Sequence, residues 1–279
     1  MKNDFIHTIP GIQPAQDPGF LLIAGPCVVE NRETLFQTAE KLKEICNRLK
    51  IPLIFKASYR KANRTRLDSF KGIGDSEALN LLDEVKRYTG LPVLTDVHET
   101  KEVDFVARFA DVLQIPAFLC RQTELIQVAA QTGKPVNLKK GQFLSAEAMR
   151  FGVEKIVETG NSRIFLTERG STFGYGDLVV DFRGIPIMKS WGYPVVLDIT
   201  HSLQAPNQPG GITGGNPQMI ETIARAGIAS GVDGIFMETH PNPSQALSDG
   251  SNMLPLSQAE KLLFNLLAIY RATKTLDQS

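Results

Sequence analysis

Short apolar stretches alternate with longer amphipathic stretches along most of the chain. The apolar stretches are rich in Val, Ile and Leu, which is typical of buried parallel strands. They predict eight strands, at residues 21–24, 53–57, 93–97, 112–115, 136–139, 163–167, 195–199 and 234–238. The amphipathic stretches carry apolar residues three and four positions apart, which predicts helices. These helices are expected at residues 33–49, 75–88, 100–108, 123–131, 146–158, 185–190, 217–230 and 258–273.

Each predicted strand is followed by a predicted helix, which is the order found in parallel α/β folds. Eight such units in a chain of 279 residues predict a single (β/α)8 TIM barrel domain spanning residues 1–279. An open, doubly wound sheet is the alternative that the same order permits. Residues 1–19 match no barrel element, and we expect them to form an N-terminal extension that caps the barrel.

Composition and charge narrow the class of protein. The hydrophobic fraction of 42% and the charged fraction of 22% are those of a globular chain, which excludes a disordered, collagen-like or coiled-coil protein. Thirty basic and thirty acidic residues balance, so we expect neither nucleic acid nor a membrane surface as a partner. No stretch is long enough to span a bilayer or resembles a signal peptide. Three cysteines are too few for a disulfide framework, and we expect a cytoplasmic protein.

Most of the predicted strands end at a polar or reactive side chain. In a TIM barrel the C-terminal ends of the strands form the rim that carries the active site. The residues expected there are Cys27, Lys56, Asp96, His98, Gln114, Lys139, Arg169, Asp198, His201, Glu238 and His240. Taken one at a time, each could equally belong to an internal ion pair of the barrel mouth.

Cations are concentrated on this expected rim. Lys61 and Arg64 follow the second strand and join Lys56, Lys139 and Arg169. A buried charge is costly without a partner, so these cations require either carboxylates of the same chain or a bound anion. Because the whole chain is neutral, such a local excess favours a site for a polyanion with one or two phosphates and a carboxylate.

A second cluster combines a thiol, an imidazole and two carboxylates, from Cys27, His201, Glu238 and Asp249. In a closed barrel the eighth strand pairs with the first, which brings these four residues together. Their mixed donor set suits Zn, Fe or Mn better than Mg or Ca. No metal-binding spacing motif supports the site, and Cys27 could instead be a buried packing residue. The glycine-rich residues 210–215, which follow His201, could form a mobile lid or a flexible connection.

Ten motifs resemble those of the 3-deoxy-D-manno-octulosonate 8-phosphate synthases, and they extend from about residue 20 to residue 270. They are AGPCVVE at residues 24–30, FKAS at 55–58, KANRT at 61–65, LTDVHE at 94–99, QIPAFL at 114–119, RQT at 121–123, KKGQF at 139–143, RGSTFGY at 169–175, DITHS at 198–202 and ETHP at 238–241. The resemblance implies condensation of phosphoenolpyruvate with D-arabinose 5-phosphate and water, in the biosynthesis of a lipopolysaccharide sugar. The products would be the eight-carbon sugar acid phosphate and inorganic phosphate.

The same resemblance implies roles for individual residues. By matching position, the catalytic residues would be Lys56, Lys61, Asp96, Lys139, His201 and Asp249, and the substrate-binding residues would be Lys56, Ser58, Lys61, Asn63, Arg64, Thr65, Gln114, Ala117, Lys139, Arg169 and His201. Asn63, Arg64 and Thr65 would receive the pentose phosphate. Arg64 and Thr65 would do so in a neighbouring subunit of a homotetramer.

Metal use divides the family that the chain resembles. Metal-independent members carry Asn where this chain has Cys27, so the resemblance implies the metal-dependent class. The ligands would be Cys27, His201, Glu238 and Asp249, and no organic cofactor is implied. The chain departs from the usual motifs at residues 71–75, at Thr65 and at residues 206–209. Three rival functions stay open: a seven-carbon acid synthase that uses erythrose 4-phosphate, a class II aldolase, and a phosphosugar-binding barrel without activity.

Overall fold

The chain folds into a closed barrel of parallel strands. The computed structural model describes residues 4–12, 19–63, 66–173, 176–208 and 212–276. The barrel strands are β1 (Leu21–Gly25), β2 (Leu53–Lys56), β3 (Val93–Asp96), β4 (Val112–Ile115), β5 (Val136–Lys139), β6 (Ile164–Glu168), β9 (Val195–Asp198) and β12 (Gly234–His240). Each pairs in parallel with the next, and β12 pairs with β1 to close the ring. The predicted barrel is therefore confirmed, and the open doubly wound sheet is excluded.

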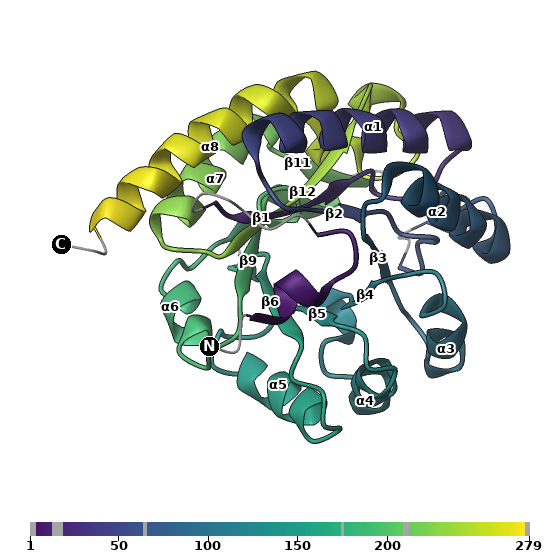
Figure 1. Cartoon of the computed structure of the whole chain (residues 1–279), viewed down its shortest axis with the longest axis horizontal. Helices are drawn as coiled ribbons and strands as arrows, with labels where there is room; N and C mark the ends of the chain where they lie inside the picture. The colour runs from purple at the N-terminus through teal and green to yellow at the C-terminus, as the bar shows by residue number, and fades with distance from the viewer. Residues whose placement is uncertain (1–3, 13–18, 64–65, 174–175, 209–211, 277–279) are drawn as a thin grey trace.

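Helices surround the barrel in one outer layer (Figure 1). They are α1 (Arg32–Leu49), α2 (Asp75–Thr89), α3 (Val103–Val106), α4 (Thr123–Gln131), α5 (Met149–Val157), α6 (Gly184–Lys189), α7 (Ile220–Ala229) and α8 (Leu256–Leu276). The third helix is shorter than expected, because a 3-10 turn, η2 (Thr100–Glu102), with a capping box between Glu99 and Glu102, precedes it. Among the described residues, no helix combines the length and the apolar composition needed to cross a membrane.

Strand alternation explains why polar residues collect at one end of the barrel interior. Successive side chains of a strand point to opposite faces, so a residue and the one two positions later share a face. Ile54, Leu94 and Val112 belong to the apolar cluster inside the barrel. Two positions later the chain carries Lys56, Asp96 and Gln114. The interior is consequently apolar towards the N-terminal ends of the strands and polar at the C-terminal rim.

The N-terminal segment packs against the apolar part of this interior. It contains the short 3-10 helix η1 (Asp4–Thr8), drawn in purple across the ring of strands in Figure 1. Phe5 and Ile9 are buried in the cluster that fills the barrel. The rings of Phe5 and Phe165, on β6, form a T-shaped pair with 4.9 Å between centroids. The single-domain organisation and the capping role of residues 1–19 remain predictions.

The loops at the rim contain secondary structure that the hydrophobic pattern did not predict. Two antiparallel hairpins are formed by β7 (Ser171–Thr172) with β8 (Leu178–Val179) and by β10 (Gln204–Gln208) with β11 (Ile212–Gly215). Further 3-10 helices are η3 (Ala117–Leu119), η4 (His201–Leu203), η5 (Pro217–Met219), η6 (Pro243–Gln245) and η7 (Gly250–Asn252). The short strand β13 (Leu254–Pro255) pairs in parallel with the C-terminal end of β12. In the expected glycine-rich lid, residues 212–215 form β11, whereas residues 209–211 lie outside the described part of the chain.

Candidate active site

A cavity of about 760 Å³ opens at the C-terminal rim of the barrel. Nine predicted site residues line it: Lys56, Lys61, Asn63, Asp96, Gln114, Ala117, Lys139, Arg169 and His201, together with the predicted metal ligand Asp249. Cys27, Ser58 and Glu238 are buried and contact residues of this lining. Arg64 and Thr65, predicted to bind a phosphate in a neighbouring subunit, lie outside the described residues.

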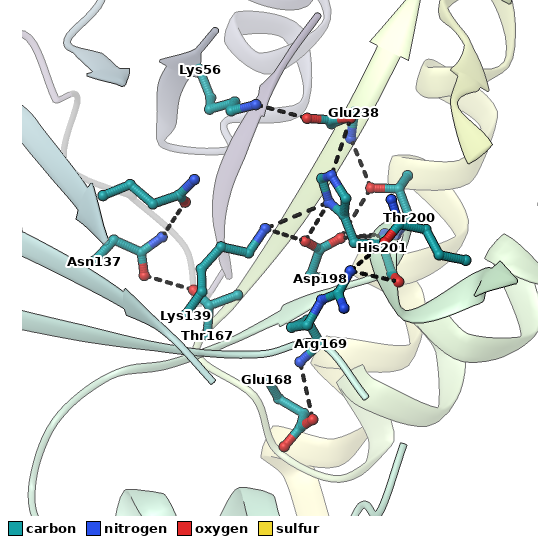
Figure 2. A network of polar contacts seen from close by, with 12 residues as sticks. Lys56, Asn137, Lys139, Thr167, Glu168, Arg169, Asp198, Thr200, His201 and Glu238 are labelled. Carbon is teal, nitrogen blue, oxygen red and sulfur yellow. Dashed lines mark hydrogen bonds and ion pairs between the residues drawn. The ribbon is translucent and has the colours of Figure 1, made fainter. Parts of the chain in front are cut away.

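Asp198, at the end of β9, organises one side of the cavity (Figure 2). Its Oδ2 accepts from Lys139 Nζ at 2.5 Å and from His201 Nδ1 at 2.7 Å. Its Oδ1 accepts from the backbone amides of Thr200 and His201. Burial would raise the pKa of Asp198, but His201 and Lys139 hold it well below its usual range. Since the carboxylate can only accept, His201 Nδ1 carries the proton of this bond, and Nε2 is turned towards Glu238.

Glu238, on β12, joins three cationic or ionisable side chains. Its Oε1 accepts from Lys56 Nζ at 2.7 Å and lies 4.0 Å from Lys61 Nζ. Its Oε2 lies 3.4 Å from His201 Nε2. Burial would raise the pKa of Glu238, but His201 and Lys56 lower it. Lys56 is therefore paired with Glu238, and Lys139 is paired with Asp198. These are the internal ion pairs that the sequence allowed as one of two possible partners for the rim lysines.

Arg169 differs from these two lysines because part of its charged group has no partner. The residue is 4% exposed, and Nη2 donates to the His201 carbonyl oxygen at 3.2 Å and to Gln204. Within the described part of the chain, its buried Nε and Nη1 atoms meet no hydrogen-bond acceptor. Burial also lowers the pKa of the guanidinium. A buried guanidinium edge left without acceptors favours binding of a phosphate or carboxylate in the cavity.

The predicted metal ligands come together around Cys27. Ligand atoms of Cys27, Glu238 and Asp249 all lie within 4.8 Å of one another. Cys27 Sγ is 3.4 Å from Asp249 Oδ2 and 3.0 Å from the hydroxyl of Ser248. His201, the fourth predicted ligand, is not part of this group of three. It lies next to the group, because its Nε2 atom contacts Glu238 Oε2.

The chemistry of this cluster fits a divalent cation. Burial raises the pKa of the Cys27 thiol, and the Glu238 carboxylate raises it further. A positive ion among these groups would reverse the effect, because it stabilises thiolate and carboxylate together. Asp249 also has a left-handed backbone with φ of 50°, a conformation that is costly for a residue other than glycine and concentrates at functional sites.

Two polar residues that were not predicted, Asn137 and Thr167, form hydrogen bonds beneath the cavity that lead to the predicted residue Gln114. Gln114 and Ser58 both donate to Asp96, and Gln114 accepts from Asn137, which accepts in turn from Thr167. The signal was available, because Asn137 interrupts the apolar stretch of β5 two positions before Lys139. Thr167 precedes Arg169 by the same interval.

A buried ion pair behind the rim was also missed. Lys140, the residue after β5, lies 3.3 Å from the Glu168 carboxylate. It donates to the Ser171 hydroxyl at 2.9 Å and to the Gly170 carbonyl at 3.2 Å. Glu168 accepts from the backbone amides of Arg169 and Gly170. The pair thus fixes the backbone from which the Arg169 side chain extends.

Comparisons with known proteins extend over nearly the whole chain. The profile of the DAHP synthetase I family matches residues 4–272. A protein of Trichlorobacter lovleyi named 2-dehydro-3-deoxyphosphooctonate aldolase is 54% identical over 249 residues, which cover 89% of this chain and 92% of the relative. Proteins with the same name are 50% identical over 267 residues in Cyanothece sp., covering 96% of this chain and 98% of the relative, and 53% identical over 249 residues in Geobacter metallireducens, covering 89% and 92%.

Proposed function

The chain belongs to the DAHP synthetase I family, and from this membership and the geometry of the rim we propose the reaction that it catalyses. It condenses phosphoenolpyruvate with D-arabinose 5-phosphate and water to give 3-deoxy-D-manno-octulosonate 8-phosphate and inorganic phosphate. Relatives named 2-dehydro-3-deoxyphosphooctonate aldolase, at 50% to 54% identity over most of the chain, support this function. The observation that carries it is Arg169, which lines the cavity together with Lys56, Lys61 and Lys139 and whose buried Nε and Nη1 atoms have no hydrogen-bond acceptor among the described residues.

We assign the substrate-binding roles by charge and position. Arg169, Lys139 and Lys61 neutralise the phosphate and carboxylate of phosphoenolpyruvate, with His201 beside them. Asn63 and Ala117, which line the same cavity, contact the pentose phosphate. In a homotetramer, Arg64 and Thr65 would complete this second site from a neighbouring subunit. Both substrates are phosphorylated metabolites, and we place the reaction in the cytoplasm.

The condensation proceeds in three bond changes. C3 of phosphoenolpyruvate attacks the aldehyde carbon of the sugar, and the aldehyde oxygen takes up a proton. Water adds its oxygen to C2 and loses a proton, which gives a hemiketal phosphate. The bond from C2 to the phosphate oxygen then breaks while the C2 hydroxyl gives up its proton, which leaves the keto acid and inorganic phosphate. Fixed cations such as Lys139 and Arg169 stabilise the phosphate charge throughout without having to reorganise.

We propose that Cys27, Glu238 and Asp249, with His201 beside them, hold one divalent cation. The thiolate and carboxylate donors favour Zn, Fe or Mn. When bound, the ion would supply a Lewis acid next to the cavity. No organic cofactor is needed for this reaction.

The test is release of phosphate from phosphoenolpyruvate with arabinose 5-phosphate or erythrose 4-phosphate, before and after chelation and with metal added back. Release with the five-carbon sugar alone supports the proposed function, and loss on chelation with recovery on metal addition supports the cation. Release only with the four-carbon sugar, or none with either, rules the function out. Arg169→Gln should lower kcat/KM about a hundredfold or more, since it removes a buried charge contact to the substrate.

The carbon–oxygen cleavage is tested with phosphoenolpyruvate carrying ¹⁸O in the bridging position. The label should leave with inorganic phosphate. Label retained in the sugar acid would contradict the third bond change.

The metal site is tested with Cys27→Ser. A hydroxyl is a poor ligand for these metals compared with a thiolate, so we expect metal affinity to fall about tenfold or more in competition with a chromophoric chelator. Cys46→Ser, a buried cysteine on α1, is the matched control. Unchanged affinity in Cys27→Ser would exclude Cys27 as a ligand.

A further inference from the structure

A chain of hydrogen bonds crosses the barrel interior at the floor of the cavity. The Thr167 hydroxyl donates to Asn137 Oδ1 at 2.6 Å, and Asn137 Nδ2 donates to Gln114 Oε1 at 2.8 Å. Gln114 Nε2 donates to Asp96 Oδ1, and the Ser58 hydroxyl donates to Asp96 Oδ2. The bond between Thr167 and Asn137 is drawn in Figure 2. Thr167, Asn137, Gln114 and Asp96 lie on the neighbouring strands β6, β5, β4 and β3, and Ser58 lies two residues after the end of β2. All five residues are buried.

The bonds all run in one direction, towards Asp96. Lys56 and Lys61 overcome the effect of burial and lower the pKa of Asp96, so its carboxylate only accepts. It therefore requires the Nε2 end of the Gln114 amide, which turns Oε1 towards Asn137. The reverse orientation of both amides would place Gln114 Oε1 against the carboxylate, acceptor facing acceptor. The Thr167 hydroxyl ends the chain by satisfying Asn137 Oδ1, which is otherwise buried without a donor.

Only the far end of this chain meets the cavity. Gln114 and Asp96 line it, whereas Asn137 and Thr167 do not belong to its lining and are completely buried. We propose that Thr167 and Asn137 are positioning residues, which hold the Gln114 amide and the Asp96 carboxylate in the orientation that receives substrate. The proposal deepens the proposed function and rests on it for its kinetic test.

The kinetic test compares two substitutions of one side chain. Thr167→Val keeps the shape and removes the hydroxyl, so Asn137 and Gln114 lose their anchor, and kcat/KM for phosphate release should fall about tenfold. Thr167→Ser keeps the hydroxyl and should stay within about twofold of the wild type. Thr38→Val is the matched control, since Thr38 is an equally buried threonine on α1 whose hydroxyl bonds the Thr34 carbonyl. Equal activity in Thr167→Val and Thr167→Ser would overturn the proposal.

A double-mutant cycle separates positioning from a general loss of stability. If Thr167 acts through Gln114, then Thr167→Val should change kcat/KM by less than about twofold in a Gln114→Leu background. Additive losses would show that Thr167 acts by another route and would also overturn the proposal.

A spectroscopic measurement tests the orientation without any activity. In protein labelled with ¹⁵N-glutamine, the Gln114 side-chain amide signal is assigned by its absence in Gln114→Leu. The signal should shift in Thr167→Val and in Asn137→Asp, which cannot donate to Gln114, but not in Thr167→Ser. An unshifted signal in Thr167→Val contradicts the proposal, whereas shifted signals in an enzyme that releases no phosphate contradict only the proposed function.

Discussion

At the scale of single residues, the rim depends on carboxylates that are surrounded by hydrogen-bond donors. Glu102 is an example outside the cation cluster. It accepts from the backbone amides of His98 and Glu99, from the His98 ring and from Arg60. Burial would raise its pKa, but the bonds from the His98 and Tyr59 side chains lower it from 4.5 to about 2.

This lowered pKa predicts a dependence of stability on pH. Because the folded-state pKa of Glu102 lies below the unfolded value, its carboxylate contributes stability that is fully present above pH 4.5 and is lost as the pH falls towards about 2. Wild type and Glu102→Gln should therefore differ most in free energy of unfolding near neutral pH, and the difference should shrink below pH 4.5 in urea denaturation series. Glu77→Gln, at an exposed position of α2, controls for loss of one negative charge. A difference independent of pH would refute this account of Glu102.

The sequence predicted the reactive residues of the rim better than it predicted their partners. Lys56 and Lys139 stand out because each ends an apolar stretch, and strand alternation turns both inwards. Their partners Glu238 and Asp198 lie 182 and 59 residues away, so only the closed barrel decides which carboxylate meets which ammonium group. The unpaired Nε and Nη1 atoms of Arg169 could not be predicted from the sequence, because their state depends on whether the folded chain places an acceptor beside them.

At the scale of elements, regular strands and helices were predictable and the rim hairpins were not. The eight barrel strands are buried on both faces, so their sequences read as continuous apolar stretches. Strand β10, by contrast, has the sequence Gln-Ala-Pro-Asn-Gln, without strand-favouring side chains. Its pairing with β11 depends on tertiary contacts, among them the bond of the Asn252 side-chain amide to the Gly214 carbonyl at 3.2 Å.

The contact between this hairpin and η7 predicts a requirement for glycine. A Cβ atom at position 215 would overlap the Asn252 side-chain amide, so Gly215→Ala must displace this side chain, which lies on the segment that carries Asp249, and disturb its bond to the Gly214 carbonyl. We expect kcat/KM for phosphate release to fall about tenfold or more, since small displacements of site residues are costly. The double variant Gly215→Ala/Asn252→Ala removes the obstacle and should match Asn252→Ala alone. A double variant as impaired as Gly215→Ala would show that the clash is not the cause.

At the scale of the whole molecule, the N-terminal segment and the barrel share one apolar interior. We propose that residues 4–12 close the N-terminal end of the barrel, because Phe5 and Ile9 are buried among the inward side chains of the strands. The sequence predicted a capping role for residues 1–19 because they match no barrel element, but it did not predict which side chains would enter the interior. Two apolar residues four positions apart, Phe5 and Ile9, are too few to predict where the segment packs.

Removal of one anchor tests the closure. Phe5→Ala should cost about 3 kcal/mol in the free energy of unfolding, because it removes a buried ring in contact with Phe165. His7→Ala, at an exposed position of the same short helix, should change stability by no more than about 0.5 kcal/mol. Equal stability of the two variants in urea denaturation would show that the segment does not contribute to the interior.

The pairing of β12 with β1 also determines when the site can exist during synthesis. Cys27 and Asp249 are separated by 222 residues, and the strand that brings their segments together is the last of the ring. A ribosome must therefore translate past residue 249 before the thiol can meet both of its carboxylate neighbours. A chain arrested before residue 234 would carry the cysteine without Glu238 or Asp249, so the proposed metal site could form only when the ring is complete.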